Sequence, residues 1–393
     1  MGHNIAVCVI CYNRKDCLER VLKSLDCAEY TEDVTLIISI DKSKTRAVQD
    51  YAENYIWKHG DKKIKAHPNN LGLRKHVLSC GEYTKYYDAV VILEDDITVS
   101  PFFMNYVIQC YEKYKDDERI AGFSLYNFPR AHVTGLPFKP VPSDYDIYMM
   151  NGACSWGQVW TKDKWEPFIK WYERNSEEFD IKELPYNINN WGEKSWLKYH
   201  MRYCIEENKY FIFPYFSLST NGADIGTHGS KVTTHIQSYL YCLPKKNWRL
   251  PTFEECVIKY DGFFEPKFLA AYLSVPDDQL CIDFYGNKKN RINRRYRLTR
   301  EALPHKIIKQ FALSYKPYEA NIICKVDGND IFLYDTEKPG IAPQPLSKQL
   351  YFEYFFLNCL ELLSDGDLRN IYIQRLRQKY INGIKKIKNL IRV

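Results

Sequence analysis

The first 125 residues alternate continuous apolar runs with segments of helical periodicity, and this alternation constrains the fold more than any other feature of the sequence. A continuous apolar run is typical of a strand that is buried on both faces of a sheet. Apolar residues at intervals of three and four are typical of helices that cover such a sheet. Strands are expected at 5–12, 34–40, 63–66, 89–93 and 120–125, with helices between them. This order predicts an α/β fold with a mostly parallel, doubly wound sheet.

Polar residues follow four of the expected strands. Ligands of doubly wound sheets bind at the carboxyl ends of the strands, so these residues should meet in one cleft. They are Tyr12, Asn13 and Arg14 after the first strand, Asp41 after the second, Asn70, Arg74 and His76 after the third, and Glu94, Asp95 and Asp96 after the fourth. The cleft is therefore expected to combine several carboxylates with cationic side chains.

Glu94, Asp95 and Asp96, here called the acidic motif, place three carboxylates side by side at a strand end. Adjacent carboxylates repel one another, and a hard divalent cation relieves that repulsion. Mn²⁺ or Mg²⁺ typically takes one or two protein carboxylates together with substrate phosphates. The alternative is a solvated acidic turn that binds nothing. The shared cleft with Arg14 and Arg74 favours the metal.

Four segments of the first hundred or so residues resemble a GT-A-fold glycosyltransferase. They read IAVCVICYNRKDCLERVLKSL, VTLIISID, NNLGLRKH and AVVILEDDITVSPFFMNYV. The chain looks most similar to inverting enzymes of the N-acetylglucosaminyltransferase I type and to their bacterial family 2-like relatives. The likeness covers about residues 5–235 and continues at 155–160, 190–193 and 226–229. It implies a GT-A fold, with a Rossmann-like, mostly parallel sheet flanked by helices, and an enzyme that uses a nucleotide sugar.

The resemblance also implies roles for the residues of the cleft. The matching positions are Arg14 and Asp41 for the uridine of the donor, Arg74 and His76 for the ribose and phosphates, Glu94 and Asp95 for the ribose and sugar, and Asp96 for Mn²⁺. Tyr12, Asn13 and Asn70 flank these positions and complete the expected donor-binding set.

Glu193 matches the catalytic base of the family, where the residue is usually Asp. Inverting transfer needs a carboxylate that takes the proton of the acceptor hydroxyl. Trp191 and Trp196 lie close enough in sequence to desolvate Glu193, which would raise its pKa toward neutrality. The alternative is an ordinary surface glutamate at a helix start, and Asp224 is then the second candidate for the base.

Two further features, between residues 156 and 231, bear on the substrates. Four tryptophans offer flat faces for sugar rings, and they are Trp156, Trp160, Trp165 and Trp191. The segment 220–231 is rich in glycine and is expected to close over the donor and exclude water. His228 lies in it, at a position that the resemblance matches to a loop over the bound donor, and it is expected as a second metal ligand.

The pattern changes along the chain and predicts three regions. Residues 1–240 are expected to form the GT-A domain, with a nucleotide-sugar-binding half at 1–126 and an acceptor and catalytic half at 127–240. Residues 241–393 are expected to form an α+β accessory region, with a hairpin at 320–335 and a helix at 346–363.

The net charge of +6 arises from two basic stretches, at 288–300 and 369–392. These carry 15 bases and no acid, so the rest of the chain sums to −9. No nucleic-acid-binding motif accompanies them, and anionic lipid or a phosphate-bearing acceptor is the expected partner. Isoleucines at 381, 384, 387 and 391 lie on one stripe of a basic C-terminal helix, which is typical of a membrane-surface anchor. The alternative is a helix that docks on its own domain.

No apolar run is long enough to cross a bilayer, and the N-terminus has no signal-peptide pattern. Together with 13 scattered cysteines, this predicts a cytoplasmic protein with free thiols, at most peripheral at the inner membrane leaflet.

These expectations combine into one function. The chain is predicted to be a metal-dependent inverting hexosyl- or N-acetylhexosaminyl-transferase. It would move a sugar from a UDP-sugar, with UDP-GlcNAc favoured, to a glycan or lipid-linked acceptor in bacterial surface polysaccharide or lipopolysaccharide synthesis. A non-catalytic sugar-binding protein is the alternative from another class. A sugar nucleotidyltransferase is disfavoured, because Tyr12-Asn13-Arg14-Lys15-Asp16 stands where it needs a glycine-rich phosphate loop.

Overall fold

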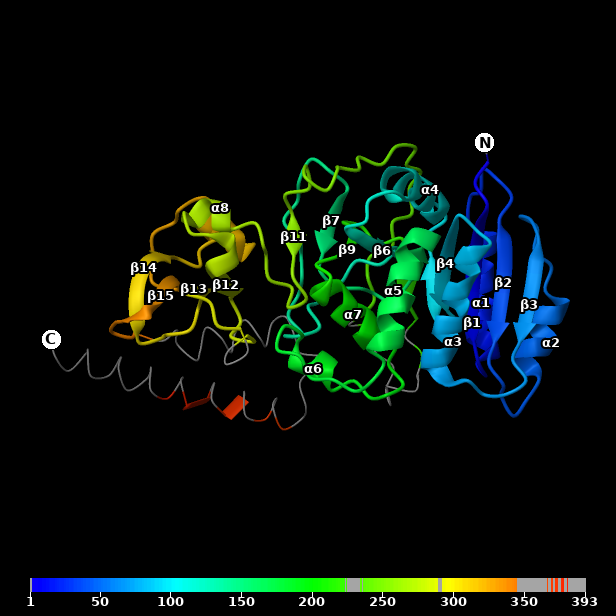
Figure 1. Cartoon of the computed structure of the whole chain (residues 1–393), viewed down its shortest axis with the longest axis horizontal. Coiled ribbons are helices and arrows are strands. Elements are labelled where there is room, and N and C mark those ends of the chain that lie inside the picture. The colour runs from blue at the N-terminus through cyan, green and yellow to red at the C-terminus, as the bar shows by residue number, and fades with distance from the viewer. Residues whose placement is uncertain are drawn as a thin grey trace.

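A computed structural model describes residues 2–222, 224, 234, 236–288 and 292–344, and seven single positions between 366 and 380. These residues form a larger body around a nine-stranded sheet and a smaller body around a four-stranded sheet (Figure 1). The predicted helix at 346–363, the terminal amphipathic helix from 381 onward and His228 lie outside the described residues.

The large sheet has the strand order β11-β7-β9-β6-β8-β4-β1-β2-β3. Its strands are β1 (Ile5–Cys11), β2 (Thr35–Ile40), β3 (Lys62–Ala66), β4 (Ala89–Glu94), β6 (Ile120–Ser124), β7 (Ile147–Met150), β8 (Gln158–Trp160), β9 (Tyr210–Pro214) and β11 (Lys259–Tyr260). The five predicted strands are therefore present, each within about one residue of its expected bounds. Residues beyond 240 add β11 to this sheet, and the predicted domain boundaries stay predictions.

The direction of the strands decides which loops meet. β1, β2, β3 and β4 are mutually parallel, β8 runs antiparallel to both β4 and β6, and β9 is parallel to β6. The carboxyl ends of β1, β2, β4 and β6 consequently lie along one edge of the sheet. We call this edge the carboxyl edge. The observed sheet confirms the predicted α/β class, and β7, β8 and β11 make it mixed rather than wholly parallel.

Helices cover both faces of the large sheet, because alternate side chains of each strand point to opposite faces. In β1, Val7 and Val9 belong to one core, whereas Ala6 and Cys8 belong to the other. The first core is closed by α1 (Lys15–Asp26), α2 (Ala47–Asn54) and α4 (Phe103–Tyr114). The second is closed by α3 (Gly72–Gly81), α5 (Lys162–Arg174) and α7 (Leu197–Glu206), of which α5 and α7 face the viewer in Figure 1.

Three short elements lie beside the carboxyl edge. β5 (Ile97–Val99) pairs antiparallel with β10 (Ser219–Asn221) directly after the acidic motif. α6 (Tyr186–Asn189) precedes α7, and the turn η1 (Glu82–Lys85) follows α3. The backbone N–H of Gly222 donates to the carbonyl of Asp96 at 2.8 Å, so the segment after β10 is fixed to the acidic motif.

The smaller body has its own apolar core and the strand order β12-β13-β15-β14. Its elements are α8 (Ala270–Leu273), η2 (Asp277–Gln279), β12 (Leu280–Asp283), β13 (Tyr296–Thr299), β14 (His305–Phe311), α9 (Tyr318–Ile323) and β15 (Ile331–Pro339). The predicted hairpin at 320–335 is wrong, because β15 pairs with β14 and the residues before it form α9. Tyr318 and Ile322, one helical turn apart, both lie in the core, which favours the helix.

The basic stretch at 288–300 is partly neutralised by neighbouring carboxylates. Lys288 is buried, and its ammonium donates to Asp261, which follows β11 of the larger body. Arg297 is also buried and donates to Asp283 at 2.6 Å. A buried and paired base does not contact a membrane, so the expected basic surface is wrong for these two residues.

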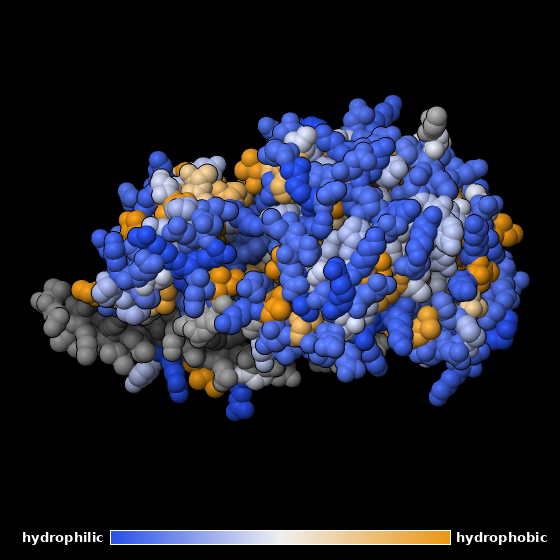
Figure 2. Space-filling model, in the orientation of Figure 1, coloured by the Kyte–Doolittle hydropathy of each residue, from blue (hydrophilic) through white to orange (hydrophobic). Residues whose placement is uncertain are grey.

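The face of the molecule in Figure 2 is mostly hydrophilic, with apolar side chains scattered singly or in small groups. Across the described ranges, no helix combines the length and the hydropathy that crossing a bilayer requires. The cysteines of the same ranges are free thiols, as expected.

Candidate active site

The acidic motif occupies the carboxyl end of β4, at the middle of the carboxyl edge. Glu94 is the last residue of β4, and Asp95 and Asp96 form the turn into β5. Arg14 stands at the start of α1, after the neighbouring strand β1, and donates to Asp95 and, at 3.0 Å, to Asp96. The structure therefore brings together Arg14 and the acidic motif, 81 residues apart in sequence, as the strand-end rule predicts.

The acidic motif holds more negative charge than Arg14 balances. Burial, followed by the carboxylates of Asp96 and Asp95, raises the pKa of Glu94 to about 8. Burial also raises the pKa of Asp95 to about 6, although the Arg14 guanidinium opposes that change. One carboxylate oxygen of Asp96, Oδ1, is buried and has no hydrogen-bond partner among the described residues. An unpartnered buried carboxylate oxygen is costly, so a cation at this position would stabilise the site.

The residues present fit a hard divalent cation that also binds the substrate. Among the described residues, no group of three or more His, Cys, Asp or Glu is arranged to hold a metal alone. Mg²⁺ and Mn²⁺ commonly use one or two carboxylates and complete their coordination with phosphates and water. Asp96, with its unpartnered Oδ1, is the residue that would hold the cation.

Asp41 organises the loop on the other side of β1. Its buried carboxylate accepts the backbone N–H groups of Lys42, Leu71 and Gly72 at distances of 2.8–3.0 Å. The side-chain amide of Asn70 donates to the carbonyl of Lys42 at 3.0 Å. These bonds fix the loop between β3 and α3 against the end of β2. The carboxylate oxygens of Asp41 already accept hydrogen bonds from the loop. Contact of Asp41 with a uridine stays a prediction.

The remaining donor-side residues differ in exposure. Tyr12 is 42 % exposed and Asn13 is also exposed, so both are accessible to a ligand at the carboxyl edge. His76 is buried, and its Nε2 lies 2.7 Å from the Ser39 hydroxyl. Arg74 donates to the Tyr199 hydroxyl on α7 at 2.9 Å. Among the described residues, neither His76 nor Arg74 hydrogen-bonds to the acidic motif.

Residues 6–130 match the model of the glycosyl transferase family 2. This part of the chain is a glycosyl transferase family 2 domain. It spans β1 to β6 and includes Arg14, Asp41 and the acidic motif. The match and the strand order together confirm the predicted GT-A architecture with an additional C-terminal region. The match does not show the narrower likeness to the N-acetylglucosaminyltransferase I type, which stays a prediction.

One solved structure similar to the chain is mannosyltransferase PcManGT from Pyrobaculum calidifontis in complex with GDP-Man and Mn²⁺. The two sequences are 13 % identical, and the match covers 55 % of this chain and 55 % of that chain with a TM-score of 0.34. Another is S. aureus TarS 1-349 in complex with UDP-GlcNAc, at 11 % identity, over 57 % and 60 %, with a TM-score of 0.36. The chain thus spans little more than half the length of these structures, and similarity of this degree assigns no activity. No curated protein matches the sequence.

Outside the family 2 domain, the structure places Glu193 in the exposed segment between α6 and α7. The predicted desolvation of Glu193 is wrong, because Trp196 is buried and packs on Trp160 with ring centroids 5.4 Å apart. Trp191 is only partly buried. Glu193 precedes α7, which carries Tyr199, the partner of Arg74, so it lies on the α7 side of the site. Its role as base stays a prediction.

Asp224, the second candidate for the base, forms an ion pair with Arg20 of α1. A second bond of the same pair, from Nη1 of Arg20 to Oδ1 of Asp224, measures 3.1 Å. This pair could not be predicted from local sequence patterns, because its members are 204 residues apart.

The four tryptophans proposed as sugar platforms fall into two groups. Trp160 and Trp165 are fully buried and pack on each other at 4.7 Å, so for them the prediction is wrong. Trp156 and Trp191 are only partly buried. The residue before Trp156, Ser155, interacts with the Glu94 carboxylate, a contact that sequence reasoning missed. The only signal for Ser155 was its place in a segment that resembles the glycosyltransferases.

Proposed function

We propose that the chain is a metal-dependent inverting glycosyltransferase that takes a sugar from a UDP-sugar. One observation carries the proposal. Within a glycosyl transferase family 2 domain, Arg14 and three carboxylates meet at the carboxyl edge, and one oxygen of Asp96 is buried without a partner among the described residues. This site lacks one positive charge, which a divalent cation with a nucleoside diphosphate would supply.

The donor would lie along the carboxyl edge from β2 to β4. Tyr12 and Asn13 are exposed beside β1 and would contact the nucleoside, next to the loop that Asp41 holds. The diphosphate would lie over the acidic motif. UDP-GlcNAc is the favoured donor, on the resemblance of the four sequence segments to N-acetylglucosaminyltransferases.

The chemistry divides between the cation and the side chains. A bound divalent cation supplies charge neutralisation for the leaving nucleoside diphosphate. Asp96 would hold that cation, and Arg14 would orient Asp95 and Asp96 through the hydrogen bonds already present. Glu193 would take the proton of the acceptor hydroxyl, since it is exposed, whereas Asp224 is held by Arg20.

We further propose a glycan or lipid-linked acceptor of bacterial surface polysaccharide or lipopolysaccharide synthesis. The reaction would take place in the cytoplasm, with the basic C-terminal segment at the inner leaflet. The support for this part is the sequence alone, namely the basic and isoleucine pattern from 369 to 392.

The test is a panel of UDP-GlcNAc, UDP-glucose, UDP-galactose and GDP-mannose, each incubated with the full chain and Mn²⁺, Mg²⁺ or EDTA. We expect release of UDP from one UDP-sugar, and loss of that release with EDTA. Release that persists in EDTA would contradict the metal dependence. Saturable binding of a donor without any release would favour the non-catalytic alternative.

A further inference from the structure

A small aromatic cavity lies beside the acidic motif, on the side away from β1. Its volume is about 150 Å³. It is lined by Tyr126, Phe128, Pro129, Arg130, Ala131, His132, Gly135, Trp156 and Ile236. We call it the aromatic cavity. Walls made mostly of rings, with a few polar groups among them, are typical of sites that bind a small organic ligand.

The sheet topology places this cavity on the carboxyl edge. The segment from Tyr126 to His132 follows the carboxyl end of β6, which runs parallel to β4. Trp156 precedes β8, the strand between β4 and β6. Two strand spacings, about 10 Å, therefore separate the end of β4 from the end of β6. A distance of this size leaves room for one sugar residue over β8 and a second over β6.

The rings of the cavity are held in fixed positions. Trp156 packs against Tyr126 with centroids 4.8 Å apart and against His132 with centroids 5.8 Å apart. The His132 ring also contacts Trp191 at 6.5 Å, two residues before Glu193. The neighbour of Trp156, Ser155, interacts with Glu94. The aromatic cavity is thus connected on one side to the acidic motif and on the other to the proposed base.

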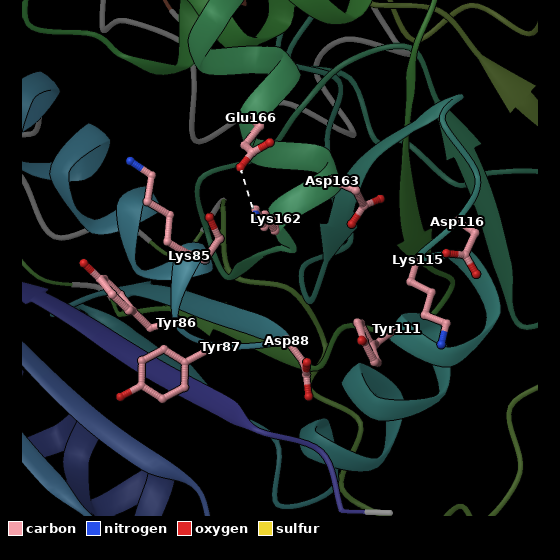
Figure 3. Close-up of a pocket in the computed structure, with 11 residues that line it drawn as sticks. Lys85, Tyr86, Tyr87, Asp88, Tyr111, Lys115, Asp116, Lys162, Asp163 and Glu166 are labelled. Atoms are coloured by element: carbon pink, nitrogen blue, oxygen red, sulfur yellow. Dashed lines mark ion pairs between the residues drawn. The ribbon is translucent and has the colours of Figure 1, made fainter.

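A larger cavity, of about 550 Å³, differs from the aromatic cavity in its position and in the residues that line it. It lies at the opposite edge of the sheet, around the residues that precede β4 and β6, such as Asp88 and Asp116. Figure 3 shows its lining of lysines, carboxylates and three tyrosines, with an ion pair of 3.7 Å between Lys162 and Glu166. Its walls are charged, and it is remote from the acidic motif, so it serves as a control site.

We propose that the aromatic cavity binds a pyranose ring of the acceptor glycan, with Trp156 and His132 as the residues that determine acceptor affinity. The proposal rests on the proposed function, in which the nucleotide occupies the β1 and β2 side. The transferred sugar then lies over β8, and the acceptor ring lies over β6. The C–H faces of a pyranose pack on aromatic rings, and the polar groups of Arg130 and His132 reach its hydroxyls.

The test uses three probes: the methyl β-glycosides of glucose, galactose and N-acetylglucosamine. Each is titrated against the full-length protein by ligand-observed NMR, with and without UDP and Mn²⁺. We expect at least one probe to bind the wild type saturably, and Trp156→Leu to weaken that binding by about tenfold. Tyr86→Leu, in the cavity of Figure 3, should leave the binding unchanged. His132→Ala gives the same comparison if Trp156→Leu fails to show a native thermal transition.

Two results would overturn the proposal. One is that no probe binds the wild type, and the other is that both aromatic-cavity variants bind a probe as tightly as the wild type does. Donor turnover separates this proposal from the proposed function. Loss of glycoside binding in Trp156→Leu or His132→Ala, with binding retained in Tyr86→Leu, supports the aromatic cavity, whereas absence of UDP release from the wild type contradicts the proposed function alone.

Discussion

The two sides of the acidic motif are built in different ways. On the β1 and β2 side, charged residues lie directly at strand ends, and short polar contacts hold them, such as those of Arg14 with Asp95 and of Asp41 with the loop at Leu71. On the β8 and β6 side, the site consists of rings on irregular segments, with Trp156 and His132 packed together. By the proposals above, the first side would bind a charged diphosphate together with a cation, and the second would bind an uncharged ring.

The largest effect is expected from the proposed base on the second side. Glu193→Gln keeps the shape of the side chain but removes its capacity to take a proton. We expect kcat for sugar transfer to fall by about 10²–10⁴, with donor affinity unchanged. Glu183→Gln, an exposed neighbour, is the matched control. If Glu193→Gln retains wild-type turnover and Asp224→Asn does not, the base is Asp224.

Asp96→Asn tests the first side. The change removes the charge of the residue whose Oδ1 has no partner in the described part of the chain. Metal-dependent release of UDP should fall by at least about 100-fold, because charge neutralisation by a metal is worth several kcal/mol. Asp116→Asn, in the remote cavity of Figure 3, should behave as the wild type does. Equal turnover of the two variants would show that Asp96 does not bind the metal.

The difference between the two sides also explains which features could be predicted from the sequence and which could not. Strand ends and their polar residues follow from local patterns, so the five strands of the family 2 domain and the meeting of Arg14 with the acidic motif were predicted correctly. Packing among rings depends on distant segments. The sequence therefore did not distinguish the buried Trp160 from the partly exposed Trp156, and it gave no indication of the pair between Arg20 and Asp224.

The helices α3 and α5 pack tightly against each other at Gly81, at the end of α3. A Cβ at this position would lie 2.4 Å from the ring of Trp165 on α5. Gly81→Ala should thus lower the free energy of unfolding, by up to about 3 kcal/mol, because the buried Trp165 has no room to move. Gly192→Ala, where a Cβ meets nothing within 4 Å, is the control in the same thermal denaturation experiment. Equal stability of both variants would show that α3 and α5 separate easily.

A smaller effect, on the pH dependence of stability, is expected from His200, which packs against the ring of Trp160 in β8. Burial lowers the pKa of His200 to about 3, and both ring nitrogens lack hydrogen-bond partners among the described residues. As the pH falls below 6.5, the unfolded chain takes up a proton at this histidine and the folded chain does not, so stability is lost. Between pH 7 and pH 5 this loss amounts to about 2 kcal/mol.

His200→Phe should remove that part of the acid-side loss, as measured by chemical denaturation at pH 7 and pH 5. Tyr203→Phe, in the same helix, is the control, because tyrosine does not titrate in this range. An unchanged pH dependence in His200→Phe would mean that His200 is protonated in the folded protein.

We propose that the carboxyl edge at β1 and β4 binds a nucleoside diphosphate together with a divalent cation. Calorimetric titration of UDP into the protein, in Mn²⁺ and in EDTA, measures this binding. The wild type should bind UDP at least about tenfold more tightly in Mn²⁺, and Asp96→Asn should abolish the difference between the two conditions. Equal affinity of the wild type for UDP in Mn²⁺ and in EDTA would contradict the claim.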